Sequence, residues 1–319
     1  MTAADLSTTA YTNFQRYLAA KKSVDDRALN HHVWMTLHNR LQEKAGDEPL
    51  RVVEIGAGIG TMVERILERD LLTKAHYTLV DAVSANIAEA RRRLPAWAAT
   101  AGFSVQQHGT ALQLNRSGTG DRQSVDVVLE FIIADCFDFA AQPELQNTVD
   151  LLVAHALLDL FDIPRALGQL QASLKPTAFL YATINFDGNT ILQPEIDRIV
   201  DDQIEAAYHA TMDARIIDGL PSGDSRTGRH LFGHVRDAGL AILAAGSSDW
   251  VVFAEEQGYP ADEAYFLHFI IETMRGALQQ TPQLDQRHFA AWIKKRHDQI
   301  DRGELVYIAH QLDFLVQGH

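Results

Sequence analysis

The 319-residue chain contains one cysteine, Cys136. A single cysteine excludes a disulfide within the chain and is compatible with a reducing compartment. Long apolar runs are also missing, since no segment approaches the roughly 20 apolar residues that a membrane-spanning helix needs. The first residues, MTAADLS, lack the charged and apolar regions of a signal peptide. We therefore expect a cytoplasmic protein with no membrane partner.

Positive charge is scarce as well. The chain has 28 Lys and Arg against 42 Asp and Glu, a formal net charge of −14. Nucleic-acid binding depends on clustered cations, so this balance argues against a nucleic-acid partner. The 14 histidines show no spacing typical of a metal site, and we expect no metal. The composition, with 46% hydrophobic and 22% charged residues, is that of an ordinary globular protein.

The most informative segment is residues 51–60, RVVEIGAGIG. Residues 52–55 have the pattern of a short buried strand, and residues 61–69 have that of a helix. Between them, Gly56, Gly58 and Gly60 allow a tight turn that brings bare backbone and a helix N-terminus close to a ligand. The dinucleotide fingerprint G-x-G-x-x-G would require glycine at position 61, which is Thr61.

Acidic residues follow the next two predicted strands. Residues 76–80 read as a second strand that ends at Asp81, where a carboxylate is placed to accept hydrogen bonds from both ribose hydroxyls. The alternative is that Asp81 caps the helix beginning near Ser84. Residues 127–134 are nearly all apolar, as expected for a central parallel strand, and are followed by Asp135 and Cys136.

A fourth strand and its helix continue the alternation. Residues 149–155 read as a strand that ends at His155, and a helix begins at Asp162 with Pro164 in its first turn. Lys175 and Pro176 end that helix before a fifth strand at residues 178–184. Further on, Tyr208, Arg229, Trp250, Tyr265 and His268 lie on segments that could cover a site.

The G-x-G-x-G turn behind Glu54 resembles motif I of the class I S-adenosylmethionine-dependent methyltransferases. The run from residue 149 to residue 184 resembles the ubiquinone/menaquinone-biosynthesis-like branch, with its H-x-L-x-D and L-K-P-G-G patterns. It departs from that branch at Thr177 and Ala178, where two glycines are usual. The resemblance implies S-adenosyl-L-methionine as cofactor, adenine contacts from Asp135 and Cys136, and Phe137 as a wall. It implies these cofactor-binding residues: Glu54, Gly56, Ala57, Gly58, Gly60, Asp81, Ala82, Asp135, Cys136, Phe137 and His155.

The predicted fold class is α/β: a doubly wound, seven-stranded, mostly parallel sheet with an antiparallel C-terminal hairpin. Residues 1–48 are predicted to form an N-terminal helical cap, in which Arg27 or His31 faces the cofactor or the solvent. Residues 49–319 form a Rossmann-like domain with insertions at about 103–125, 188–225 and 258–303. Two strands are expected to make the hairpin: one at residues 241–254, broken by a polar bulge at residues 246–249, and one at residues 304–316.

The predicted function is methyl transfer to a small-molecule acceptor by in-line displacement. His155 is the candidate general base by position, and the alternative is a histidine that closes the cofactor pocket. Asp159 is read as a possible loop acid. A non-catalytic S-adenosylmethionine-binding regulatory or partner subunit is the second hypothesis. A nicotinamide oxidoreductase is the third, disfavoured by Thr61. A homodimer is possible.

Overall fold

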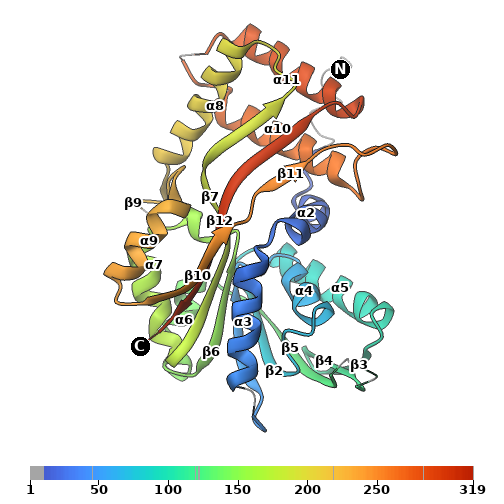
Figure 1. Ribbon diagram of the computed structural model, residues 1–319, viewed down its shortest axis with the longest axis vertical. Coiled ribbons are helices and arrows are strands. Elements are labelled where there is room, and N and C mark those ends of the chain that lie inside the picture. The colour runs from blue at the N-terminus through green and yellow to red at the C-terminus, as the bar shows by residue number, and fades with distance from the viewer. Residues whose placement is uncertain are drawn as a thin grey trace.

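A computed structural model describes residues 11–44, 46–118, 120, 123–217, 219–282 and 284–318 (Figure 1). The helices are α2 (Phe14–Ala28), α3 (His31–Lys44), α4 (Thr61–Glu68), α5 (Ser84–Thr100), α6 (Cys136–Ala140), α7 (Ile163–Leu170), α8 (Arg198–Asp213), α9 (Thr227–Asp237), α10 (Glu263–Leu278) and α11 (Gln286–Asp301). Short 3₁₀ turns lie at Pro143–Leu145 (η1), Leu158–Leu160 (η2) and Gln171–Ser173 (η3).

The strands of the central sheet are β1 (Leu50–Ile55), β2 (Lys74–Asp81), β3 (Ser104–His108), β4 (Ala111–Arg116), β5 (Val125–Ile133), β6 (Val149–His155), β7 (Leu174–Gln193), β10 (Ala241–Ser247), β11 (Trp250–Val252) and β12 (Val306–Gln317). Two short strands, β8 (Ile216–Ile217) and β9 (Leu220–Pro221), pair with each other apart from it.

The strand order is β10-β12-β7-β6-β1-β2-β5-β4-β3, and β11 also pairs with β12. The five strands from β7 to β5 are parallel, as predicted. The last strand, β12, runs antiparallel to β10 and lies between β10 and β7. The largely parallel α/β architecture of the prediction is therefore confirmed.

The predicted number of seven strands is wrong, because ten strands of the described chain join this sheet. The hairpin of β3 and β4 prolongs it, since β4 pairs with β5. The predicted sixth strand is two strands, β10 and β11, separated at Ser248 and Asp249. The Asp249 carboxylate accepts hydrogen bonds from Ser247 Oγ (2.6 Å) and the Gln311 N–H (3.2 Å), which replace ladder pairing at the break.

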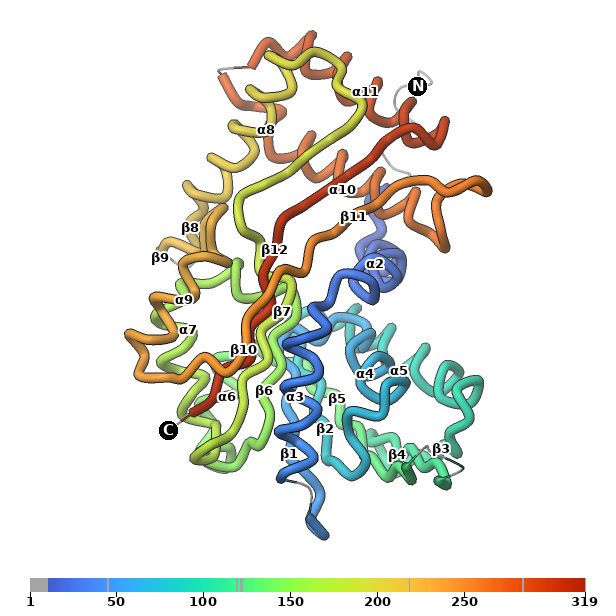
Figure 2. The backbone as a smooth tube through the Cα atoms, in the orientation of Figure 1, coloured from blue at the N-terminus to red at the C-terminus, as the bar shows by residue number. Residues whose placement is uncertain are grey.

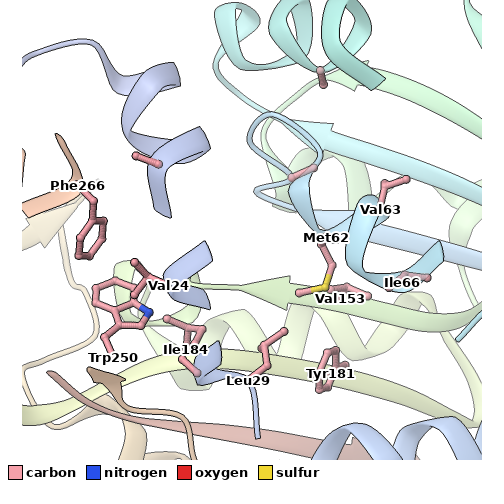
Figure 3. Close-up of a cluster of buried hydrophobic side chains, with 14 of the residues drawn as sticks. Val24, Leu29, Met62, Val63, Ile66, Val153, Tyr181, Ile184, Trp250 and Phe266 are labelled. Atoms are coloured by element: carbon pink, nitrogen blue, oxygen red, sulfur yellow. The ribbon is translucent and has the colours of Figure 1, made fainter. Parts of the chain in front are cut away.

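Each central strand buries both of its faces, so neighbouring residues join different cores. Val52, Leu151 and Tyr181 pack with α2, α3, α4 and α5 on one face. Val53, Leu152 and Leu180 pack with α6, α7 and α9 on the other. Figure 3 shows part of the first core, where Val153 and Tyr181 of the sheet meet Met62 and Ile66 of α4. The apolar runs of the sequence thus produce a doubly wound sheet.

Two strands extend well beyond this core. The fifth strand, predicted at residues 178–184, is β7 and spans 20 residues. Figures 1 and 2 show β7 and β12 leaving the lower sheet and running up between α8 and α10. Ile184 of β7 has a φ of +58°, which lies in the left-handed region. A β-branched residue there is strained, and such strain tends to occur beside functional sites. No helix of the described residues is long and apolar enough to span a membrane.

Candidate functional site

A cavity of about 560 Å³ lies at the carboxyl ends of the parallel strands, where open α/β sheets bind ligands. The strand order divides its lining, because β1, β2 and β5 lie on one side of β6 while β7 and β12 lie on the other. We call the two parts the glycine compartment and the aromatic compartment. The glycine compartment is lined by Glu54, Gly56, Ala57, Gly58, Asp81, Ala82, Val83, Asn86, Ala134, Asp135 and Cys136. The aromatic compartment is lined by Phe14, Tyr17, Ile184, Phe186, Tyr208, Met212, Trp250, Phe269, Ile270 and Tyr307.

The glycine turn has the geometry that the sequence predicts. Gly56, Gly58 and Gly60 have φ values of +63°, +54° and +80°. A Cβ on Gly56 would lie 2.6 Å from Leu157 Cδ1, so a side chain there would displace the wall of the cavity. The Ala57 N–H donates to the Val80 carbonyl (3.0 Å), which joins the turn to β2. Gly60 precedes α4 and does not line the cavity.

Asp81 ends β2, and its side chain is almost fully buried. One oxygen accepts from the Gly58 N–H (2.8 Å), and the other accepts from the Val83 N–H (2.8 Å) and from Asn86 Nδ2 (3.2 Å). The carboxylate therefore holds the glycine turn and the start of α5 together. The bonds on the α5 side come from the residue before the helix and from the Asn86 amide, so Asp81 lines the cavity and does not cap the first N–H groups of the helix.

Glu54 is a buried acid at the base of the glycine compartment. Its carboxyl accepts a hydrogen bond from Tyr77 Oη (2.8 Å). Burial raises the pKa of Glu54 to about 8, and the Tyr77 hydrogen bond and the charge of Arg65 only partly offset this. A cation bound in the compartment would favour the ionised form.

Three residues after β5 were predicted to surround the adenine, and the structure places two of them in the lining of the cavity. Asp135 lines the cavity and caps α6 by accepting from the Phe137 N–H (2.8 Å). Cys136 also lines it, and burial raises the pKa of this thiol to about 12. Phe137 is not in the lining. It packs edge-on against Phe161 at 4.9 Å, and Phe161 takes the place of a wall.

His155 lies at the end of β6 with both ring nitrogens engaged. Nε2 is 2.9 Å from an Asp25 carboxylate oxygen, and Nδ1 is 2.8 Å from Thr183 Oγ1. An ionised Asp25 requires the proton on Nε2, so Nδ1 accepts from the threonine hydroxyl. Burial and the charge of Lys21 lower the pKa of His155 to about 4. The neutral ring thus has no free lone pair for a substrate proton and joins β6 to α2.

Asp25 is the centre of this network, and the sequence prediction missed it. One oxygen contacts Lys21 Nζ (2.6 Å) and His155, while the other accepts from Trp250 Nε1 (2.9 Å). Burial alone would raise the pKa of Asp25, but Lys21, His155 and Arg65 hold it well below its usual range. The only sequence signal was the four-residue spacing of Lys21 and Asp25, which is equally typical of a surface pair.

The covering residues suggested by the sequence separate into two groups. Tyr208 and Trp250 line the aromatic compartment, and Asp159, which was read only as a possible loop acid, lines the cavity between the two compartments. Arg229, Tyr265 and His268 lie outside the lining. Arg27 also lies outside it and pairs with Glu263 of α10 at 2.6 Å, and His31 is not in the lining. The sequence suggested a partly aromatic pocket through Tyr208 and Trp250, but the other residues of the aromatic compartment were missed because they come from α2, β7, α8, α10 and β12.

Comparison with known proteins identifies the family of the chain. Residues 27–209, more than half of the chain, match a family model described as a methyltransferase domain. The chain belongs to this methyltransferase family. No curated protein matches the sequence.

Several solved structures resemble the chain at low identity. One is a SAM-dependent methyltransferase from Thiobacillus denitrificans in complex with S-adenosyl-L-homocysteine, at 12% identity, 91% coverage of this chain and 92% of that one, and a TM-score of 0.42. Another is YjhP from E. coli, at 17% identity, coverage of 92% and 94%, and a TM-score of 0.41. A third is geranyl diphosphate C-methyltransferase from Streptomyces coelicolor, at 10% identity, coverage of 89% and 76%, and a TM-score of 0.41. At these scores the similarities carry no argument about substrate.

Proposed function

We propose that this protein is an S-adenosyl-L-methionine-dependent methyltransferase that acts on a small-molecule acceptor by in-line displacement. One observation carries the proposal: the glycine turn, Asp81 and Asp135 meet in one compartment, and that compartment continues into a second, aromatic one. A donor and an acceptor would then lie side by side, which is the arrangement that methyl transfer requires.

The glycine compartment fits the donor in shape and charge. Gly56 and Gly58 leave a surface that a Cβ would fill or strain. Asp81 would hold the ribose hydroxyls, Asp135 and Cys136 the adenine, and Ala57, Ala82 and Gly60 would shape the turns around them. S-adenosylmethionine supplies the methyl group on a positively charged sulfur. Glu54 has no cation in direct contact within the described part of the chain, and it is suited to lie near that positive charge.

A backbone feature supports the resemblance to the ubiquinone/menaquinone-biosynthesis-like branch, and we therefore favour an acceptor of that branch. Thr177 occupies the first position where that branch usually has glycine, and its φ is +62°. The chain keeps the glycine conformation there while lacking the glycine. We also propose that residues 1–48 act as a cap over the site, since Phe14, Tyr17 and Leu18 of α2 line the cavity.

The continuous cavity also bears on the alternative of a non-catalytic cofactor-binding subunit. Such a subunit needs only the glycine compartment, whereas here Tyr208, Trp250 and Tyr307 enclose further space beside it. We therefore favour an enzyme. His155 is proposed as a residue that closes the cavity, because its hydrogen bonds to Asp25 and Thr183 occupy both nitrogens.

The test of the donor site is the variant Asp81→Ala, titrated calorimetrically with S-adenosylhomocysteine. We expect a loss of about 1–3 kcal/mol in binding free energy, the scale of a hydrogen bond to a charged group. Asp237→Asn, at an exposed position on α9, is the matched control and should bind like the wild type. Because Asp81 also holds the glycine turn, melting of each variant is measured in parallel. Unchanged affinity in Asp81→Ala would refute the ribose assignment.

A further inference from the structure

Asp159 occupies the boundary between the two compartments. It lies in η2, directly after β6, and lines the cavity. Its backbone is fixed by Arg215, whose guanidinium donates to the Asp159 carbonyl (2.5 Å). Gly223 packs against the same carbonyl so closely that a Cβ there would lie 2.7 Å from the oxygen. The position of this residue is therefore set by the protein before any ligand binds.

The carboxylate of Asp159 accepts no hydrogen bond from another residue of the described chain, whereas each other acid that lines the cavity accepts at least one. Asp25 and Asp81 use both of their oxygens to hold neighbouring elements. The charge of Asp159 acts on Tyr17, Lys21 and Tyr208, which also line the cavity. A half-buried carboxylate without a partner is available to a ligand.

The aromatic compartment offers no cation to an anionic ligand. Among the described lining residues the only Lys or Arg is Lys21, and its ammonium is paired with Asp25 at 2.6 Å. His155 is neutral near pH 7, since burial and Lys21 lower its pKa to about 4. A phosphate or carboxylate on the acceptor would therefore be desolvated without a partner and repelled by Asp159.

The walls of this compartment suit a ring-sized apolar body. Tyr17 stacks on Phe269 at 4.1 Å between ring centroids, and Trp250 packs edge-on against Phe266 at 5.3 Å. The hydroxyls of Tyr17, Tyr208 and Tyr307 make no hydrogen bond to another described residue, which leaves polar groups within an otherwise apolar wall. Aromatic walls of this kind bind flat rings by stacking and by edge contacts.

We infer that Asp159 is the group that takes the proton from the acceptor, and that the acceptor is an apolar, ring-sized compound with a hydroxyl or amino nucleophile and no anionic group. This inference rests on the proposed function. The oxygen or nitrogen lone pair of the acceptor forms a bond to the methyl carbon as the carbon–sulfur bond breaks, and that electron pair stays on sulfur. The O–H or N–H proton passes to the Asp159 carboxylate and then to water.

The burial of Asp159 agrees with this role. Desolvation raises the pKa of Asp159, against the opposing charge of Arg215. A raised pKa makes a carboxylate a stronger base towards the proton of an acceptor.

The experiment compares uncharged and anionic acceptors in wild type, Asp159→Asn and the control Asp237→Asn. The uncharged probes are para-ethylphenol and para-ethylaniline, and the anionic probes are para-ethylbenzoate and para-ethylphenyl phosphate. Methyl transfer from S-adenosylmethionine is followed by mass spectrometry across pH, and S-adenosylhomocysteine binding is measured by calorimetry on the same samples. We expect transfer to an uncharged probe only. We also expect Asp159→Asn to lose about 10²–10⁴-fold in kcat, to lose the acid limb of the pH profile, and to keep wild-type affinity for S-adenosylhomocysteine.

Other results would overturn the role of Asp159, the acceptor class or the proposed function. Wild-type kcat and pH profile in Asp159→Asn would overturn the role of this residue. Preferred methylation of an anionic probe, or no transfer to either uncharged probe by protein that binds S-adenosylhomocysteine, would overturn the acceptor class. Failure of the wild type to bind S-adenosylhomocysteine would instead overturn the proposed function.

Discussion

The buried acid Glu54 makes stability depend on pH. Its pKa is about 8 in the folded protein, against an ordinary value of 4.5, because burial disfavours the charged form. Between these values the folded protein holds a proton that the unfolded chain releases. The contribution of Glu54 to the free energy of unfolding is therefore complete below about pH 4.5 and is lost as the pH rises to about 8.

Glu54→Gln tests this directly. The amide keeps an oxygen that can accept from Tyr77 Oη but does not titrate. We expect the variant to lose less stability than the wild type from pH 5 to pH 8, with a slope difference approaching about 1.4 kcal/mol per pH unit. Urea unfolding at several pH values measures it. Parallel pH dependences in the two proteins would show that Glu54 is ionised in the fold.

Thr177 gives a second prediction at the residue scale. Its φ of +62° strains a residue that has a Cβ, and glycine adopts this conformation without that strain. Thr177→Gly should raise the free energy of unfolding by up to about 1 kcal/mol, since the added chain entropy of glycine offsets part of the gain. Thr177→Ala keeps the Cβ and is the matched control. A loss of stability in the glycine variant, compared with the alanine variant, would contradict this account.

At the residue scale, the sequence predicted the residues whose type is required by the local backbone or by the end of a strand. Gly56, Gly58 and Asp81 were found because a tight turn and a strand end require particular residue types. Asp25 and Asp159 were not assigned. A carboxylate that is buried by distant elements has the same sequence pattern as one on a solvated helix or loop.

At the scale of elements, α2 and α10 form a wall of the cavity and are joined by two ion pairs. Arg27 donates to the fully buried carboxylate of Glu263 at 2.6 and 2.8 Å. Arg16 donates to Asp262 at 2.8 Å, but both side chains are about half exposed. The two pairs share the same helices and differ in burial, so each is a control for the other.

We expect Arg27→Ala to lower the free energy of unfolding by about 1–3 kcal/mol, because Glu263 would keep only Ser23 as a side-chain partner. Arg16→Ala should cost less than about 1 kcal/mol, as is usual for exposed pairs. Denaturant unfolding of both variants gives the comparison. Equal losses would mean that burial of Glu263 does not govern the strength of the contact.

The sequence located most elements but not their extent. The strands β1, β2, β5 and β6 were predicted from apolar runs and from the polar residues at or just after their ends, and the glycine turn from its three glycines. The length of β7 was not, because its second half pairs with β12 across more than 100 residues of sequence. The division of residues 241–254 into β10 and β11 falls within the polar bulge predicted at residues 246–249, where Asp249 accepts from the Gln311 N–H.

At the scale of the molecule, the cavity is closed by the two ends of the described chain. Tyr17 comes from α2, near the start, and Tyr307 from β12, near the end. A ligand in the cavity would therefore contact the cap, the core sheet and the upper helices together. Figure 1 shows these parts meeting around α2 and β11.

Ligand binding should accordingly stabilise the whole fold. S-adenosylhomocysteine at about 100 times its Kd adds about 2.7 kcal/mol, and we expect a rise of several degrees in Tm by differential scanning calorimetry. NAD at the same concentration is the control for the oxidoreductase alternative and should leave Tm unchanged. A rise with NAD alone would reverse the assignment of the glycine compartment.

Calorimetric titration of the purified protein with S-adenosylmethionine, and separately with S-adenosylhomocysteine, tests the central claim most directly. The account predicts micromolar binding of both, weakened by Asp81→Ala and unaffected by Asp159→Asn. Absence of binding by either compound would contradict it, since the glycine turn and Asp81 would then serve the fold alone or another nucleotide.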